Sequence, residues 1–238
     1  MKMKFALLSA SCLVALSVVQ SHASNIALVN GDFSANQGQG KVFLWDATGA
    51  PTGLIPGWTP SGPGGAINYD LGGLYVGNSG VDGAPDNSNY GGAAHLWLDS
   101  YDPSVFQTTS YSAQSGDQYT LSLNISGEWA PDGNHDSLVS LYYVSGLSKV
   151  VFASQTFTGP NAWGWTPQTL TGAAPGAAVG DLIGVEIQNV TPESGLASNN
   201  DDSYTSFGNV TLGVVPEPAS IVLVSLGGLA LVAFRRRA

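Results

Sequence analysis

Aromatic side chains are the residues of this sequence best suited to holding a ligand. Six tryptophans are many for a chain of 238 residues, and indole faces stack on sugar rings while Asp, Asn and Gln bond the hydroxyls. In the segment 95–99 an extended backbone would place Trp97 and Asp99 on the face opposite Leu96 and Leu98. We predict sugar contacts from Trp97, Asp99, Trp129, Trp163 and Trp165. The alternative is that most of these indoles pack inside the fold or under its loops.

Carboxylates are the second group that could carry chemistry, because two of them across a cleft can hydrolyse a glycosidic bond. Nothing in the sequence pairs the available residues, which are Asp99, Asp102, Glu128 and Asp136. The chain has no Gly-x-Ser-x-Gly elbow and no His-Glu-x-x-His metal motif. We therefore expect no enzymatic activity, and a glycan-active enzyme is the least favoured alternative.

Short segments of alternating apolar and polar residues must position these side chains. In Tyr119–Ser126 the side chains of Tyr119, Leu121, Leu123 and Ile125 share one face of an extended strand. Turn signals such as Ser115-Gly116-Asp117 separate the segments. Further strands are predicted at Ile26–Phe33, His95–Asp99, Val105–Ser112, Leu138–Val144, Lys149–Phe157, Leu182–Val190 and Phe207–Gly213. The pattern predicts an all-β fold, an antiparallel β-sandwich.

Charge and cysteine content exclude several classes of function for the region 24–214. It contains two basic residues, Lys41 and Lys149, against 16 Asp and Glu, a formal net charge of −14. Binding to nucleic acid is disfavoured because phosphate contacts need Lys and Arg, and attraction to an anionic membrane surface is disfavoured too. The single cysteine, Cys12, precedes this region, which excludes disulfides, thiol catalysis and Cys-ligated zinc from it.

The N-terminal segment has the features of a secretory signal peptide. Two lysines, Lys2 and Lys4, precede the apolar stretch Phe5–Val19, and Ser21-His22-Ala23 is a small-residue cleavage site. We predict a signal peptide over 1–23, cleaved after Ala23, and a single-domain ectodomain over 24–214.

The C-terminal segment 215–238 has three parts. Val215-Pro216-Glu217-Pro218 is extended because proline cannot continue a helix, 219–234 is apolar, and the arginines follow it. About 16 residues at 1.5 Å each barely span a ~30 Å hydrocarbon core. Three basic residues, Arg235, Arg236 and Arg237, would hold this end on the cytoplasmic side. From spacing alone, a permanent anchor and a recognition site for a processing enzyme are equally compatible with the tail.

These three parts together closely resemble the PEP-CTERM sorting signal of Gram-negative bacteria that make exopolysaccharide. The resemblance rests on Val215, Pro216, Glu217, Pro218, the apolar stretch and the arginine cluster. It implies recognition and removal of the tail by a membrane enzyme, exosortase. The transmembrane helix over 219–234 would then hold the protein in the membrane only transiently.

The ectodomain resembles the galactose-binding-like jelly roll of many carbohydrate-binding modules. The resemblance lies in Asn30-Gly31-Asp32-Phe33, Gly57-Trp58-Thr59, the hairpin 105–121 and the closing strand 207–212, where Gly208 replaces the family's usual Asp. It implies a structural calcium ion, Ca²⁺, between the first and last strands, with Asn30 and Asp32 as ligands. Because Gly208 removes one expected carboxylate, we expect Asp201 and Asp202 in the loop before the last strand to supply oxygens instead. The alternative is that these residues only form turns.

Taken together, the sequence predicts an exported protein that passes through the inner membrane and ends at the cell surface or in the extracellular matrix. Three hypotheses remain open for its role: a structural or adhesive partner of exopolysaccharide, a carbohydrate-binding module with a defined sugar pocket, and a glycan-active enzyme.

Overall fold

The structure is a computed structural model, and it describes residues 23–36, 42–44, 52–62, 72–75, 95–98, 103–127, 135–160, 164–191 and 205–216. All of them belong to one compact unit, His22–Glu217. The predicted signal peptide up to His22 and the predicted transmembrane segment 219–234 lie outside the described residues.

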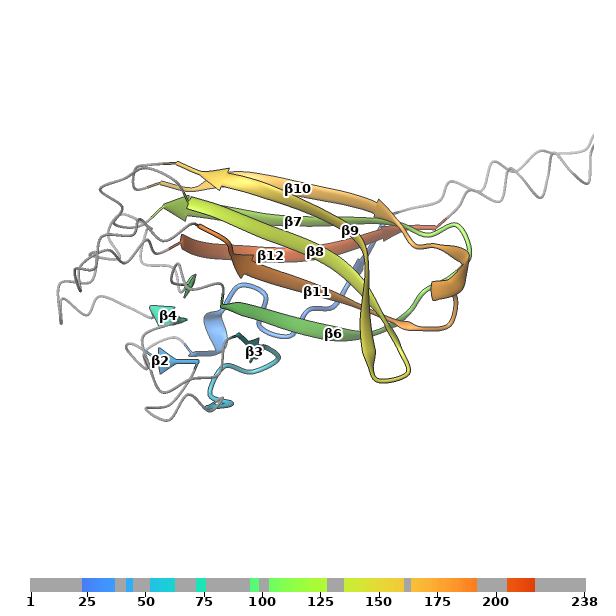
Figure 1. Cartoon of the computed structure of the whole chain (residues 1–238), viewed down its shortest axis with the longest axis horizontal. Coiled ribbons are helices and arrows are strands. Elements are labelled where there is room, and N and C mark those ends of the chain that lie inside the picture. The colour runs from blue at the N-terminus through green and yellow to red at the C-terminus, as the bar shows by residue number, and fades with distance from the viewer. Residues whose placement is uncertain are drawn as a thin grey trace, which may run out of the picture. The chain divides into compact units, whose positions relative to one another are not determined.

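The described part of the chain consists of β-strands and two short 3-10 helices, with no α-helix within it (Figure 1). In chain order these are β1 Ser24–Ile26, η1 Ser34–Asn36, β2 Val42–Phe43, β3 Thr59–Ser61, β4 Gly72–Tyr75, β5 His95–Leu98, β6 Ser104–Ser112, β7 Gln118–Gly127, β8 His135–Ser145, β9 Ser148–Gly159, β10 Thr166–Ala173, η3 Gly176–Ala178, β11 Leu182–Asn189 and β12 Thr205–Val215.

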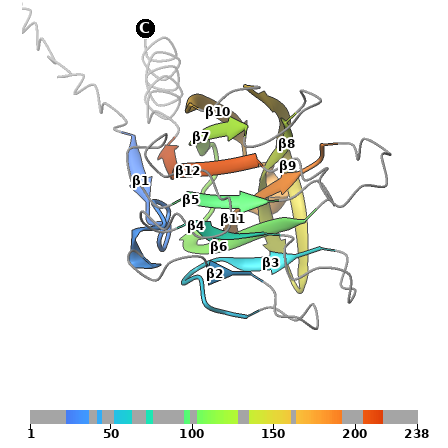
Figure 2. The ribbon, with the colours of Figure 1, turned by 90° about the vertical axis from the view of Figure 1, so that its left-hand side faces the viewer.

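The strands form two antiparallel sheets. The seven-stranded sheet has the order β10-β7-β12-β5-β4-β2, and β1 pairs with the end of β12 (Figure 2). The five-stranded sheet has the order β3-β6-β11-β8-β9. From β9 onward successive strands alternate between the sheets, as in a jelly roll. The predicted antiparallel, jelly-roll-like β-sandwich is confirmed.

The hydrophobic core fills the space between the two sheets. Leu121 and Ile125 of β7 and Val185 and Ile187 of β11 are 0% exposed, and they alternate with more exposed residues along their strands. Burying a side chain of this size contributes about 1.5–3 kcal/mol. The period-two pattern in the sequence therefore marks the inward faces of the central strands.

The predicted first strand, Ile26–Phe33, is wrong over most of its length. β1 ends at Ile26, and the residues around Asn30 form a turn in which Asn30 and Phe33 have positive φ angles of 55° and 59°. The Phe33 N–H donates to the Asn30 carbonyl at 3.1 Å. The alternation of apolar residues here reflects the turn's contact with the core, where Phe33 is 0% exposed.

The edge strand β10 was not predicted from the sequence. It contains Pro167 and Gly172, and its one core side chain is Leu170. An edge strand tolerates proline because one row of its N–H groups has no partner strand. With a single inward apolar residue, such a strand has no alternating pattern to detect.

Candidate functional site

The aromatic candidates meet on the outer face of the seven-stranded sheet, around β5. Leu96 and Leu98 point into the core between the sheets, which leaves Trp97 and His95 on the opposite face. Both are nevertheless 0% exposed. The predicted exposure of Trp97 is therefore wrong. β5 lies inside the sheet between β4 and β12, and all four of its side chains, on both faces of the strand, are buried.

Trp165 lies over the same face and is half-buried. Its ring meets the His95 ring edge-on, with the centroids 5.8 Å apart. Its six-membered ring would lie 3.3 Å from a Cβ placed on Gly208 of β12. A side chain at position 208 would require the indole to move by a few tenths of an ångström, so glycine lets Trp165 lie close to the sheet.

Hydroxyl groups lie in the same layer as the two indoles. Ser126 of β7 and Ser206 of β12 are paired across the sheet and are both 0% exposed. The Ser126 Oγ accepts a hydrogen bond from the Gly164 N–H at 3.3 Å, which ties the segment before Trp165 to the sheet. Within the described residues Ser206 Oγ has no hydrogen-bond partner. Among Trp97, Trp165, His95, Ser126 and Ser206, only Trp165 is partly exposed, and its indole lies against His95 and Gly208.

The remaining predicted sugar contacts, Asp99, Trp129 and Trp163, lie outside the described residues. The same holds for the carboxylates Asp102 and Glu128. Asp136 is described, and its Oδ1 accepts a hydrogen bond from the Thr158 hydroxyl at 2.6 Å. The structure thus places Trp97 and Trp165 of the predicted set on the same face of the sheet, and Trp165 contacts His95 and lies against Gly208, which sequence reasoning did not assign to a sugar site.

The predicted calcium ligands Asn30 and Asp32 lie in the turn after β1. Asn30 Oδ1 accepts from the Ala35 N–H at 2.9 Å, and Asp32 Oδ1 accepts from the Ser34 N–H at 3.1 Å and its hydroxyl at 2.9 Å. The backbone hydrogen bond from Ser34, followed by the one from its hydroxyl, lowers the pKa of the Asp32 carboxyl. These two oxygens therefore cap η1 and stabilise the turn.

A hollow of about 330 Å³ lies beside this turn, between β1 and β12. Its lining residues are Asn25, Ile26, Leu28, Asn30, Gly31, Asp32, Val210, Thr211 and Leu212. Asp32 is its one carboxylate, and no group of three His, Cys, Asp or Glu converges anywhere in the described ranges. Asp201 and Asp202 lie outside those ranges. The calcium site therefore stays a prediction.

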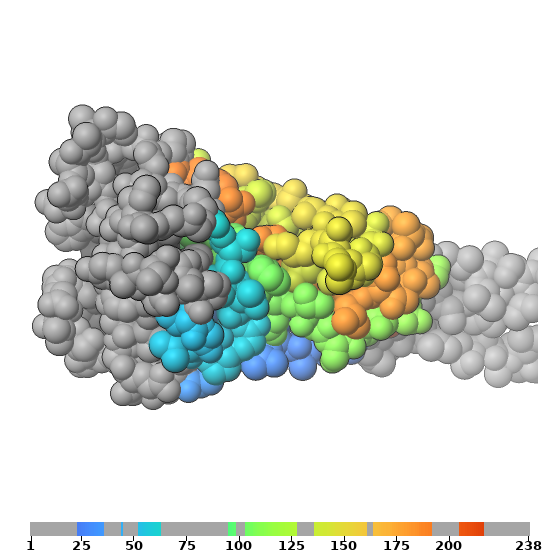
Figure 3. All heavy atoms as spheres, turned by 60° about the horizontal axis from the view of Figure 1, so that its bottom comes forward, coloured from blue at the N-terminus to red at the C-terminus, as the bar shows by residue number. Residues whose placement is uncertain are grey.

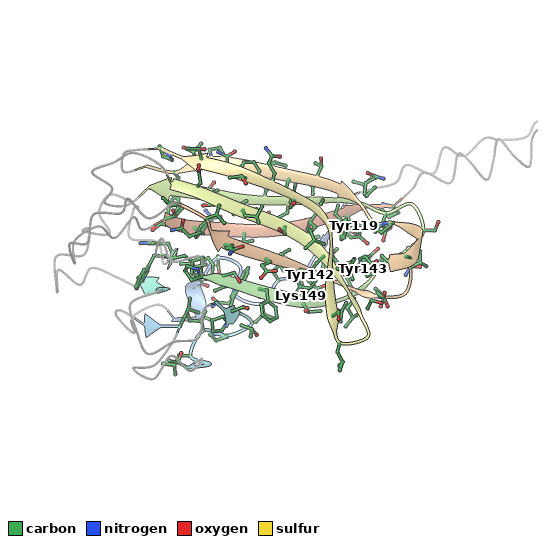
Figure 4. The ribbon with its side chains drawn as sticks, in the orientation of Figure 1. Tyr119, Tyr142, Tyr143 and Lys149 are labelled. Carbon is green, nitrogen blue, oxygen red and sulfur yellow. The ribbon has the colours of Figure 1, made fainter. Side chains whose placement is uncertain are left out.

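A second cluster, on the outer face of the five-stranded sheet, was not found from the sequence. Lys149 Nζ lies 2.8 Å from Glu186 Oε1, 4.0 Å from the Phe106 ring centroid and 5.5 Å from the Tyr142 ring centroid. Figure 4 shows Lys149 beside Tyr142, where the β8–β9 hairpin crosses the sheet. Glu186 is 37 residues from Lys149 in the sequence. The only feature of the sequence that could have drawn attention to Lys149 was the rarity of basic residues.

Tyr142 is the buried base of this Lys149 cluster. Its ring lies where a Cβ on Gly184 of β11 would overlap it, and its hydroxyl is 2.8 Å from the Thr108 hydroxyl. Burial is the main cause that raises the pKa of Tyr142 to about 12. Through Lys149 the cluster joins the β8–β9 hairpin to Glu186 of β11 and Phe106 of β6.

The sorting tail begins where the sandwich ends. β12 ends at Val215, which pairs with Gln118 of β7, and Pro216 follows directly. Glu217, Pro218 and the three arginines, Arg235, Arg236 and Arg237, lie outside the described residues. No helix in the described part of the chain is long and apolar enough to cross a bilayer.

Comparison with known families assigns this end of the chain. Residues 214–237 match the PEP-CTERM protein-sorting motif. The tail is a PEP-CTERM sorting signal. Such a signal implies an exported protein that passes through the membrane and is processed at its C-terminal end. No curated protein matches the chain.

Solved structures with a similar arrangement of strands include several carbohydrate-binding modules. TmCBM61 in complex with β-1,4-galactotriose has 12% identity and a TM-score of 0.44, and the match covers 79% of this chain and 98% of that one. A CBM4 module has 17% identity and a TM-score of 0.43, with 80% and 100% covered. The enzymatically active domain of bacteriophage CBA120 tailspike protein 4 has 13% identity and a TM-score of 0.43. There the match covers 73% of this chain but only 22% of the tailspike chain. At these TM-scores the likeness says nothing about what this chain binds.

Proposed function

We propose that this chain is an exported protein of the cell surface or extracellular matrix whose β-sandwich associates with exopolysaccharide in a structural or adhesive role. The observation that carries the proposal is the sorting signal at 214–237, which starts at the last residues of β12. An exosortase-type membrane enzyme would cut the tail within or next to Val215–Pro218. The mature protein would then be the sandwich without its membrane segment.

The chemistry of the ectodomain supports a neutral glycan as its partner. A net charge of −14 over 24–214 repels uronates and other polyanions, whereas a neutral polysaccharide rich in hydroxyl groups is not repelled. The half-buried Trp165, held against Gly208 and His95, offers a flat apolar surface of the kind on which sugar rings stack.

A dedicated carbohydrate-binding module is the second candidate, and the same Trp165 platform favours it. The two proposals differ in selectivity. A module with a defined pocket would select one oligosaccharide, and a matrix component would bind host exopolysaccharide with weak selectivity. A glycan array with the purified ectodomain 24–216 separates them.

The experiment has two arms, export and glycan binding. In the producing bacterium, replacing Pro216-Glu217-Pro218 by alanines should leave the protein in the membrane fraction, while the unaltered chain reaches the surface or medium. Protein that stays in the cytoplasm in both strains would overturn the proposal. In the second arm, Trp165→Ala should weaken binding of the ectodomain to host exopolysaccharide roughly ten-fold, about 1.4 kcal/mol.

The matched control for the second arm is Leu147→Ala. It also removes a large apolar side chain, but at the exposed tip of the β8–β9 hairpin, where Leu147 is 105% exposed. Equal binding by both variants and the unaltered domain would contradict the role of Trp165. A thermal melt of each variant shows whether a loss of binding is a loss of fold.

A further inference from the structure

Three segments form the end of the sandwich at which the chain leaves β12. They are the β6–β7 turn with its flanks (113–118), the β10–β11 connection (173–182), and Val215–Pro216; we call them the tail-side end. Ala173, Gln118 and Val215 are neighbours across β10, β7 and β12. Figure 1 shows the β6–β7 and β10–β11 connections at the end toward which β12 points.

Backbone hydrogen bonds join these segments into one surface. The Gly180 N–H donates to the Ala113 carbonyl, and the Ala113 N–H donates to the Asp181 carbonyl, both at 2.9 Å. The Ala174 N–H donates to the Asp117 carbonyl at 3.4 Å. The tail-side end is therefore a rigid face, and in Figure 3 its green and orange atoms lie side by side.

This face presents almost no charge, although the domain around it is strongly acidic. Asp117 is 1% exposed, and one of its carboxylate oxygens accepts hydrogen bonds from the Tyr111 and Tyr119 hydroxyls. Asp181 is half-buried. Its exposed residues are uncharged: Gln114, Ser115, Gln118, Ala173, Pro175, Gly176, Ala177, Val179, Gly180, Leu182 and Pro216. Val179 and Leu182 add apolar surface, at 49% and 39% exposed.

The sorting tail brings this face close to a bilayer. Three residues, 216–218, separate Val215 from the start of the apolar segment, a reach of about 10 Å when extended. The head-group layer on each side of the hydrocarbon core is itself roughly 5–7 Å thick. Two of the three residues are prolines, which limits how far the connection can bend.

We propose that, while the tail is in the membrane, the tail-side end of the sandwich rests on the lipid head groups. The proposal builds on the sorting function above and specifies how the precursor is held. A face with several exposed carboxylates would be repelled by anionic lipids, and on this face the half-buried Asp181 is the one carboxylate that is not fully buried. The surface nearest to the start of the sorting tail is thus one whose exposed residues are uncharged, which allows it to approach the membrane closely.

The test uses the chain Ser24–Ala238, which contains no native cysteine, so single cysteines can carry a fluorophore. Ser115→Cys and Ala177→Cys place the probe on the tail-side end. Thr156→Cys, exposed on β9, is the matched control. Each labelled chain is reconstituted into phosphatidylethanolamine–phosphatidylglycerol vesicles with a nitroxide quencher on the lipid head groups.

We expect head-group quenching at positions 115 and 177 to exceed that at 156 by at least about three-fold, and to disappear in a chain that ends at Pro216. Adding a carboxylate by Ala177→Asp should reduce quenching at 115 in these vesicles but not in purely zwitterionic ones. Equal quenching at 115, 177 and 156 overturns the inference and leaves the sorting function intact. A chain that fails to float with the vesicles overturns both.

Discussion

At the scale of single residues, polar side chains in this protein mostly stabilise turns. Asp32 caps η1 through the backbone and hydroxyl of Ser34, and Asp117 accepts hydrogen bonds from Tyr111, Tyr119 and the Gln114 N–H. The resemblance to the galactose-binding-like family predicts Asp32 as a calcium ligand, but a carboxylate can equally accept hydrogen bonds within a turn. The competing local hydrogen bonds only become visible once the backbone conformation of the turn is known.

Replacing Asp32 separates these two roles. Asp32→Ala should lower the free energy of unfolding by about 0.5–2 kcal/mol, the cost of losing a cap, and to the same extent with and without a chelator. The measurement is a thermal melt of the ectodomain 24–216 in EDTA and in millimolar calcium, with Asp32→Asn as the control that keeps a capping oxygen. A calcium-dependent rise in melting temperature that Asp32→Ala abolishes would show instead that the carboxylate binds the ion.

Three tyrosines make stability depend on alkaline pH. Burial, as the largest cause, raises the pKa of Tyr111 and of Tyr142 to about 12 and raises that of Tyr119 as well. Above pH 10, the ordinary value, the unfolded chain releases these protons while the folded chain keeps them. Their stabilising contribution is therefore complete below pH 10 and is lost as pH rises toward 12.

We accordingly expect the urea midpoint of the ectodomain to fall between pH 10 and 12, and to fall less steeply in Tyr111→Phe. Absorbance at the phenolate band follows ionisation in the same samples. If these tyrosines ionise near pH 10 with the fold intact, their burial is not what the structure describes.

At the scale of elements, the sequence predicts strands well where one face is buried and the other is solvated. β7 and β11 follow the expected alternation almost to the residue. Trp97 lies on the outer face, as predicted, but it is not exposed there. A period of two gives the face on which a side chain lies, but it does not say whether another segment covers that face. The meeting of Trp165 with His95 and Gly208 joins residues distant in sequence, which no local pattern reports.

The β8–β9 hairpin illustrates a further long-range contact. Ser145 and Ser148 pair across the turn Gly146-Leu147, and Lys149 then reaches Glu186 and the Phe106 ring. Gly146 has a φ of 63°, which glycine adopts at little cost. The lysine thus holds the hairpin to the sheet close to its turn, by charge and by its contact with the rings.

Removing that anchor should loosen the hairpin without unfolding the sandwich. We expect Lys149→Ala to lower the free energy of unfolding by about 1–2 kcal/mol, from the lost cation–π contact and a partly exposed ion pair. Amide hydrogen exchange should increase in 142–151 and stay unchanged in β7. Lys149→Met keeps the apolar stem of the side chain, so it should lower the free energy of unfolding less than Lys149→Ala does. Equal losses in the two variants would contradict a contribution from packing of the stem.

At the scale of the whole molecule, the sandwich and the sorting signal meet without a linker. β12 carries the fold up to Val215, and β1 starts at Ser24, paired with Val214. The first residue after the predicted signal-peptide cleavage and the first residues of the sorting motif therefore lie side by side. Removal of both terminal segments would leave the two sheets with their pairing complete.

The intact mass of the protein recovered from the surface or medium of the producing bacterium tests this account most directly. We predict one species that begins at Ser24 and ends within Val215–Pro218, plus the mass of any group attached there, and a membrane-bound precursor when Pro216-Glu217-Pro218 is replaced by alanines. Recovery from the surface of a chain that still contains residues 219–238, or recovery only from the cytoplasm, would contradict it.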